Sequence, residues 1–381
     1  MASKTALPTA LPTELPTTTG AAVLTEHGKP LERQELPLPK EVEPGAALVR
    51  ITCATLCGTD VHLWSGRMSL PDMLPMVLGH EMVGEVVAAG DGTVDTFGRA
   101  IAAGDRIGWS ESTCGECRGC SVLREPVLCA RRGYGFRQRA DRPPYATGGL
   151  AEYCYVTPGA AKLILPADVP DGWAAMSGCA GKTVLRAVDR VGGIRPGSTV
   201  VVQGAGALGI VATAVAHISG AGMVITVGSP TGRLVTATRF GATAAVPLDL
   251  GVADRIARVY ELTGGRGADY VFDFAGGPTV GEEAVAFAAQ RGRIAVVGST
   301  GPATSPVPLG TIMGKELTVA GSLNGDIADY HRAVEFFRTF GDRMPWDELL
   351  SEPVGLARAT DSVRAMSRLD QIKAVVDPRL P

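Results

Sequence analysis

The chain has 381 residues, more than one hydrophobic core usually contains, so we expect two domains. Its 36 Lys and Arg residues nearly balance 39 Asp and Glu residues, and the net charge of -3 argues against nucleic-acid or anionic-membrane partners. The sequence contains no stretch of about 18 apolar residues, so it predicts no membrane span. A chain this long does not need disulfide bonds for stability, so its eight cysteines point first to metal binding or redox chemistry.

Residues 1–20 contain mainly Thr, Pro, Ala and Leu and almost no charge. They lack the cationic start and unbroken apolar core of a secretory signal, so they predict a disordered tail and a cytoplasmic protein. The part that follows, to about residue 165, consists of short β-branched runs broken by Gly and Pro, for example at 47–53, 82–88 and 151–156. These runs predict a first domain rich in β-strands.

After about residue 181, strand-like and helix-like runs alternate. The predicted strands lie at 199–203, 223–227, 269–273, 293–297 and 316–320. The predicted helices between them lie at 210–219, 233–240, 252–263 and 280–290. This alternation builds βαβ units, and the nearly all-apolar strands indicate a sheet covered on both faces. The fold class is therefore α/β with a doubly wound parallel sheet, followed by helices at 327–340 and 356–368 and a strand at 372–376.

A glycine-rich loop joins the first of these strands to the first helix, with the sequence Gly204-Ala-Gly206-Ala207-Leu208-Gly209. In such a loop the first glycine permits a tight turn, the second lets the backbone approach a pyrophosphate, and the third lets helix and strand pack closely. The helix N-terminus then offers free N–H groups to phosphate. We interpret the loop as a dinucleotide site; the alternative is a plain glycine turn in a protein with 49 glycines.

The expected cofactor is NAD(P), with NADP preferred. Hydrogen bonding to the ribose 2′-hydroxyl of NAD requires an acidic residue after the next strand, but segment 227–233 contains none. Gly228, Ser229 and Arg233 instead form a small loop with a hydroxyl and a cation, which suits a 2′-phosphate. The alternative is a loop that lacks the acid and still binds NAD.

Four cysteines lie within sixteen residues, at Cys114, Cys117, Cys120 and Cys129. Each two-residue spacing forms a turn that directs neighbouring sulfurs to one point, and four thiolates complete a tetrahedral zinc site with no open position. We therefore expect a structural zinc ion. An iron–sulfur cluster and a pair of disulfides are the alternatives, and disulfides are disfavoured in a cytosolic protein.

A second group of potential ligands is spread along the chain. Cys57 follows an early predicted strand, His80 lies about twenty residues later, and Cys179 precedes the alternating region. Two thiolates and a neutral imidazole make a three-ligand zinc site that leaves one position for water or substrate. Each residue alone has a simpler interpretation, since cysteine is often a small buried hydrophobe and a lone histidine is seldom a ligand.

Together these motifs resemble the zinc-containing medium-chain dehydrogenase/reductase (alcohol dehydrogenase) family. The matching segments are Cys57-Gly-Thr59-Asp60-Val-His62, Gly79-His80-Glu81, the four-cysteine group, Gly149-Leu-Ala-Glu-Tyr153 and the loop 204–209. The resemblance implies a GroES-like β-barrel catalytic domain at 21–181 and 323–381, and a Rossmann domain at 182–322. It departs from the common pattern in the last spacing of the four-cysteine group, which has eight residues where seven is commoner.

The resemblance also implies roles for individual residues. The catalytic zinc ligands would be Cys57, His80 and Cys179. Thr59 would hydrogen-bond the alcohol, and His62 would pass its proton towards solvent. Asp60 would orient the imidazole of His80, and Glu81 would approach the metal during ligand exchange. Thr183 would contact the nicotinamide and Lys373 would lie near the pyrophosphate. The full set of expected cofactor contacts outside the glycine-rich loop is Thr183, Gly228, Ser229, Arg233, Val297, Gly298 and Lys373.

The implied function is reversible hydride transfer between an alcohol, expected to be secondary or cyclic, and NAD(P), with two zinc ions per chain. Cys179 stands where polyol-oxidising relatives often carry Glu, which weighs against a sugar alcohol. The alternatives are an NADPH-dependent carbonyl or enoyl reductase and a non-catalytic cofactor-binding protein. Residues 316–320 resemble the family's sheet-edge strand, which implies a homodimer or homotetramer. Trp64, Trp109 and residues 134–136 are candidates for the substrate pocket.

Overall fold

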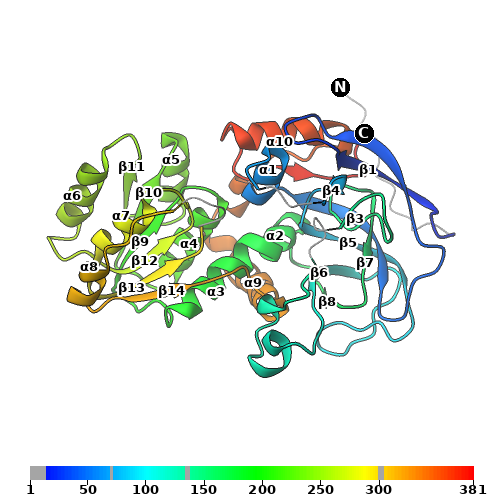
Figure 1. Ribbon diagram of the computed structural model, residues 1–381, viewed down its shortest axis with the longest axis horizontal. Coiled ribbons are helices and arrows are strands. Elements are labelled where there is room, and N and C mark those ends of the chain that lie inside the picture. The colour runs from blue at the N-terminus through cyan, green and yellow to red at the C-terminus, as the bar shows by residue number, and fades with distance from the viewer. Residues whose placement is uncertain (1–13, 69–71, 134–137, 299–303) are drawn as a thin grey trace. The chain divides into compact units, whose positions relative to one another are not determined.

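The computed structural model describes residues 14–68, 72–133, 138–298 and 304–381, and the chain divides into two compact units (Figure 1). The first unit holds the chain up to Cys179 together with Asp326–Arg338 and Asp347–Pro381. The second holds Ala180–Gly325 and Thr339–Trp346. Within the four described ranges, no helix combines the length and the apolar character that a membrane crossing requires.

The first unit is built on two antiparallel sheets. One sheet has the order β15-β3-β5-β6-β8, with β7 also paired to β3, and the other has the order β2-β1-β4. The strands are β1 (Thr18–Leu24), β2 (Glu32–Pro37), β3 (Ala47–Thr55), β4 (Met76–Val77), β5 (Glu81–Ala89), β6 (Arg106–Ser112), β7 (Tyr153–Val156), β8 (Ala160–Ile164) and β15 (Val375–Val376). Every residue of β3 is buried, which places this strand at the centre of the unit.

Helices of the first unit connect and cover these sheets. They are α1 (Gly58–Ser65), α2 (Asp171–Met176), α9 (Ile327–Phe340) and α10 (Ala359–Ser367), and a π-helical turn at Ser177–Gly181 follows α2 directly. α2 packs on β3 and β5, and α1 packs on α10. The predicted helix 356–368 is a short 3-10 turn, Leu356–Arg358, followed by α10.

Strand β1 begins inside the segment that we expected to be a disordered tail. Thr18 pairs with Pro37 and Gly20 pairs with Glu35 of β2, so the expectation is wrong for Thr18–Gly20. The hydrogen bonds come from a partner strand outside the segment, which local composition does not reveal. Residues 1–13 of the expected tail lie outside the described residues.

The second unit contains one parallel sheet with the order β11-β10-β9-β12-β13-β14. Its strands are β9 (Thr199–Gln203), β10 (Met223–Gly228), β11 (Ala244–Pro247), β12 (Ala268–Asp273), β13 (Ala288–Val296) and β14 (Thr318–Gly321). Its helices are α3 (Lys182–Arg190), α4 (Ala207–Ile218), α5 (Thr231–Arg239), α6 (Val252–Leu262), α7 (Val280–Phe287) and α8 (Leu309–Gly314). The α/β class with a doubly wound parallel sheet is confirmed, and the strand order reverses between β9 and β12, where such sheets bind their ligands.

The helices of the second unit pack against one another in two separate groups. α3 packs on α4 and α4 on α5, whereas α6 packs on α7 and α7 on α8. One boundary differs from the prediction: α7 ends at Phe287 and not at 290, because Ala288 already pairs with Ala268 of β12. Pairing with a distant strand outweighs the helical preference of the local sequence there.

Candidate functional site

Two short segments of the first unit meet at the buried carboxylate of Asp60. Cys57 caps the N-terminus of α1, and its backbone N–H donates to Asp60 Oδ2 at 2.8 Å in a capping box. Asp60 Oδ1 accepts the N–H of Gly79 at 3.0 Å and lies 3.4 Å from His80 Nδ1. One carboxylate thereby sets the positions of Cys57 and His80 together. Because Nδ1 of His80 faces Asp60, Nε2 is the ring nitrogen left for a metal.

The second cysteine of this group comes from the π-helical turn that follows α2. The ligand atoms of Cys57, His80, Glu81 and Cys179 all lie within 4.8 Å of one another. The Cys57 and Cys179 sulfurs are 3.9 Å apart, and both thiols are free. Two sulfurs bound at about 2.3 Å to one tetrahedral zinc ion lie about 3.8 Å apart. The residues present therefore fit a zinc ion.

Glu81 belongs to the same close group and lies at the start of β5, opposite Thr55 of β3. Its Oε2 accepts hydrogen bonds from the Thr55 hydroxyl and the Lys373 ammonium. Its buried Oε1 has no hydrogen-bond partner in the described part of the chain. A buried oxygen without a partner is unfavourable, and a nearby cation would satisfy it.

Lys373 has different neighbours from those expected near a cofactor pyrophosphate. Its side chain is 1% exposed and pairs with Glu81. Burial alone would lower the pKa of Lys373, but Glu81 and the thiols of Cys57 and Cys179 raise it overall. In this position a pyrophosphate contact would require the ammonium to leave Glu81. Neither Thr55 nor the Lys373–Glu81 pair was found by sequence reasoning.

The neighbours of Cys57 and His80 shift the pKa values of these two side chains. The Cys179 thiol, together with Lys373 and His80, lowers the pKa of Cys57 well below its usual value, against the effect of burial. Burial would lower the pKa of His80, but Asp60 and Cys57 raise it overall. The site therefore favours a thiolate at Cys57, which is the form that binds metal.

Thr59 and His62 lie three residues apart on α1 and so share one face of the helix. Thr59 Oγ1 is 4.0 Å from Cys57 Sγ. Burial, followed by the charge of Arg67, lowers the pKa of His62, and its Nδ1 has no hydrogen-bond partner among the described residues. His62 is therefore neutral near neutral pH and has a ring nitrogen available for a proton.

Two candidates for the substrate pocket, Trp64 and Trp109, have contacts within the first unit. The Trp64 indole donates to the Lys29 carbonyl at 2.7 Å, and Trp109 packs against the core residues Ile51 and Met82. Residues 134–136 lie outside the described residues.

The four clustered cysteines also come together. The sulfurs of Cys114 and Cys129 are 3.5 Å apart, those of Cys117 and Cys120 are 3.7 Å apart, and all four lie within 4.8 Å of one another. Backbone N–H groups of residues 116 and 117 lower the pKa of Cys114 to about 6, whereas burial raises that of Cys120 to about 12. The spacings match a tetrahedral zinc site, and the extra residue before Cys129 does not separate the ligands.

The glycine-rich loop has the local geometry that a pyrophosphate requires. Gly204 has a φ of +113°, a conformation that favours glycine, and Gly206 caps α4 with open space where a Cβ would lie. A Cβ at Gly209 would overlap the Gly204 carbonyl oxygen. Ala207 and Leu208 form the first turn of α4, whose N–H groups are free to bind phosphate.

The other expected cofactor residues of the second unit lie at or near the carboxyl ends of strands or in the helices beside them. Gly228 ends β10, Ser229 follows it, and Arg233 lies in the first turn of α5, where burial lowers its pKa. The N–H groups of Val297 and Gly298, just after β13, donate to the Asp273 carbonyl at 3.0 and 2.9 Å. Thr183 of α3 donates to Asn324 Oδ1 at 3.5 Å.

Two buried polar residues lie at the point where the strand order reverses, and no motif in the sequence predicted them. Gln203 ends β9 and Asp273 ends β12, and the two are register partners, each 2% exposed. Asp273 Oδ1 accepts the N–H groups of Ala275 and Gly276 at 2.9 Å. A polar residue at the end of an apolar strand was the available signal.

Comparisons with known proteins agree with both units. Residues 43–167 match the family model of the alcohol dehydrogenase GroES-like domain, and residues 207–339 match that of the zinc-binding dehydrogenase. A 5-exo-hydroxycamphor dehydrogenase of Pseudomonas putida is 33% identical over 366 residues, covering 94% of this chain and 99% of the relative. The GroES-like domain expected in the first part of the chain is thereby confirmed.

Solved structures show the same architecture. An alcohol dehydrogenase from Thermotoga maritima superimposes with a TM-score of 0.86 at 28% identity, covering 94% of this chain and 99% of that one. A protein of Sinorhizobium meliloti 1021, crystallised with NADP, has a TM-score of 0.79 at 27% identity, covering 95% and 100%. The chain therefore belongs to the zinc-containing medium-chain dehydrogenase/reductase (alcohol dehydrogenase) family of oxidoreductases.

Proposed function

We propose that the protein is a zinc-dependent alcohol dehydrogenase that transfers hydride between a secondary or cyclic alcohol and NADP. The observation that carries the zinc dependence is the convergence of Cys57, His80 and Cys179, with the two sulfurs 3.9 Å apart. The substrate class is supported by the P. putida relative, since 5-exo-hydroxycamphor is a secondary alcohol on a ring.

In this proposal Cys57, His80 and Cys179 hold the catalytic zinc ion. When bound, zinc supplies Lewis acidity, which lowers the pKa of an alcohol. Asp60 orients the His80 ring through Nδ1, and Glu81, whose carboxylate lies within 4.8 Å of the other ligand atoms, would offer a further oxygen during ligand exchange.

The proton of the alcohol is taken up on α1. The Thr59 hydroxyl would receive the alcohol proton as it gives up its own, and His62, one turn later, would take up the released proton because its lowered pKa keeps it neutral. We therefore assign proton transfer to Thr59 and His62.

The second unit binds the cofactor in this proposal. The loop 204–209 and the first turn of α4 hold the pyrophosphate, and Ser229 and Arg233 hold the 2′-phosphate. NADP is supported by the lack of an acidic residue in 227–233 and by the S. meliloti structure, which contains NADP. The four clustered cysteines hold a second, structural zinc ion.

We further propose that two copies associate through β14. This strand is at the edge of the parallel sheet, and three of its four residues are exposed. Leu309 and Met313 of the preceding helix α8 are 74% and 78% exposed. An unpaired strand edge beside exposed apolar side chains is typical of a surface that pairs with another chain.

The test combines metal analysis with kinetics. We expect about two zinc ions per chain by mass spectrometry, and oxidation of cyclic secondary alcohols with a higher kcat/KM for NADP than for NAD. Cys57→Ser and His80→Ala should each retain about one zinc ion and lose turnover. The matched control is Cys53→Ala, because Cys53 is buried in β3 outside the ligand group, and it should keep both metal and activity.

Several results would contradict the proposal. Full metal content and activity in Cys57→Ser would remove the catalytic zinc assignment. Reduction of carbonyl or enoyl substrates that persists in both ligand variants would favour a zinc-independent reductase. Cofactor binding without turnover of any alcohol or carbonyl would favour a non-catalytic protein.

A further inference from the structure

A residue about 150 positions away along the chain contacts the turn that carries Cys179. We propose that Tyr330 of α9 is a positioning residue for Cys179: its ring and hydroxyl hold the turn from which the thiol projects. The inference rests on the proposed function, because it takes Cys179 as a ligand of the catalytic zinc ion.

The turn that carries Cys179 has an unusual backbone. α2 ends at Met176, and the π-helical turn Ser177–Gly181 follows without a break. In a π-helix the hydrogen bonds span five residues in place of four, and such turns occur mostly singly and often at functional sites. Because the changed spacing rotates each later side chain relative to a regular helix, the junction between α2 and this turn sets the direction of Cys179.

Tyr330 contacts this junction at two points. Its hydroxyl donates to the carbonyl of Ala174, in the last turn of α2, at 3.0 Å. Its ring lies against Gly178, where a Cβ would be 3.6 Å from Tyr330 Cζ. The side chain is completely buried, and burial raises the pKa of its hydroxyl, which therefore stays protonated and able to donate. A single side chain thus holds the α-helical turn before the junction and the residue directly before Cys179.

Strand β6 closes the space on another side of the hydroxyl. A Cβ at Gly108 would overlap the Tyr330 hydroxyl, so glycine is needed there as long as the tyrosine keeps its position. Gly108 pairs with Val83 of β5, the strand that begins with Glu81. The sheet that carries Glu81 therefore also locates the side chain that holds Cys179.

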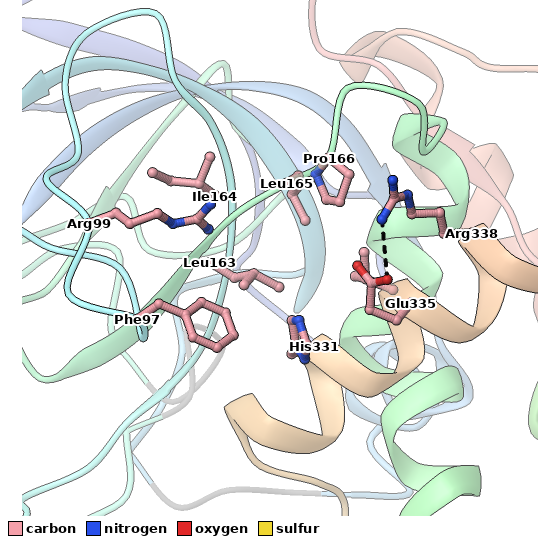
Figure 2. A pocket seen from close by; sticks show the side chains of 10 residues that line it. Phe97, Arg99, Leu163, Ile164, Leu165, Pro166, His331, Glu335 and Arg338 are labelled. Atoms are coloured by element: carbon pink, nitrogen blue, oxygen red, sulfur yellow. Dashed lines mark hydrogen bonds and ion pairs between the residues drawn. The ribbon is translucent and has the colours of Figure 1, made fainter.

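The next residue of α9 makes separate contacts and offers a matched control. His331 points into a cavity of about 410 Å³ that is also lined by Phe97, Leu163 and Arg338 (Figure 2). Its ring meets the ring of Phe97 edge-on, with the centroids 4.9 Å apart. Replacing His331 therefore weakens the packing of α9 without altering the contacts with Ala174 and Gly178.

The test measures metal binding in the zinc-loaded protein. Tyr330→Phe keeps the ring and removes only the hydroxyl, and we expect zinc release from the Cys57–His80–Cys179 site to a chromogenic chelator to become about ten-fold faster. Release from the four-cysteine site should not change. Cys57→Ser identifies which release phase belongs to which site, because it should abolish only one of them.

Cobalt substitution gives a spectroscopic signature that a general loss of stability would not produce. The four-cysteine site contributes equally to wild type and Tyr330→Phe, so their difference spectrum reports the other site. We expect a shift of the thiolate-to-cobalt absorption in Tyr330→Phe and in Gly108→Ala, which forces the hydroxyl to move. His331→Ala should leave the spectrum and both release rates as in wild type.

The outcomes separate the inference from the proposed function. A wild-type release rate and cobalt spectrum in Tyr330→Phe, with one release phase missing in Cys57→Ser, would reject the role of Tyr330 alone. Two unchanged phases in Cys57→Ser would reject the proposed function itself. Equal changes in Tyr330→Phe and His331→Ala would show a general effect of α9 packing and would also overturn the inference.

Discussion

Lys373 and Glu81 form an ion pair beside the Cys57–His80–Cys179 group, with side chains 1% and 0% exposed. Removing one partner of such a pair leaves the other charge buried, which typically costs about 3–5 kcal/mol. We expect Lys373→Met to lower the free energy of unfolding by about this amount in urea titrations of the zinc-loaded protein. Glu81→Gln added to Lys373→Met should restore much of the loss, because neither charge of this pair is then left buried without its partner.

A second buried lysine is the control for this prediction. Lys162 Nζ donates to the backbone carbonyls of Gly45, Thr157 and Ala160 at 2.8, 3.2 and 2.9 Å. Glu81→Gln should therefore not rescue Lys162→Met. If Glu81→Gln fails to rescue Lys373→Met, or rescues both lysine variants equally, the ion pair is not the source of the effect.

The loop between β5 and β6 is a structural element held by one buried carboxylate. Asp95 Oδ1 accepts the N–H groups of Phe97 and Arg99 at 2.9 Å, and Oδ2 accepts Nε of Arg99 at 2.6 Å. Burial by itself raises the pKa of Asp95, but these hydrogen bonds lower it overall. The loop carries Phe97 and Arg99, two of the side chains that line the cavity in Figure 2.

The direction of this shift predicts a pH dependence. A carboxylate with a lowered folded-state pKa stabilises the fold above its unfolded-state pKa, near 3.8, and this contribution is lost as the pH falls through the folded-state value. We expect Asp95→Asn to lower the free energy of unfolding by about 1–3 kcal/mol at neutral pH. The difference in the free energy of unfolding between Asp95→Asn and wild type should become smaller below pH 3.8. Both proteins are unfolded in urea at each pH and followed by tryptophan fluorescence. A difference that is constant with pH would contradict the role of the ionised carboxylate.

At the scale of the whole molecule, the proposed assembly depends on the exposed edge of the parallel sheet. Val319 of β14 is 45% exposed, and a lysine on an edge strand disfavours pairing with another chain. We expect Val319→Lys to shift the mass measured by analytical ultracentrifugation from dimer or tetramer towards monomer. Val235→Lys is the control, since Val235 is 56% exposed on α5, and it should keep the wild-type mass. A monomeric wild type, or an unchanged mass in Val319→Lys, would reject association through β14.

Local patterns in the amino-acid sequence determined much of the architecture. The alternation of strand and helix signals after residue 181 predicted the parallel sheet, because hydrophobic period and turn residues act over a few positions. The spacing of the cysteines from Cys114 to Cys129 predicted that their sulfurs come together. The spacing of the glycines in 204–209 predicted a loop shaped for a pyrophosphate, for the same reason. Each of these features needs only residues that are neighbours along the chain.

Other features depended on contacts between segments far apart along the chain, and only the tertiary structure decided them. The start of β1 and the end of α7 follow from pairing with other strands. Lys373 is 292 residues from Glu81, and Tyr330 is 156 residues from Ala174. No periodicity or spacing links such residues, because their contacts form when β15 and α9 return to the first unit and bury these side chains together. The sequence by itself therefore determined the ligand types and the loop chemistry, and tertiary packing decided which buried charges and hydroxyl groups surround them.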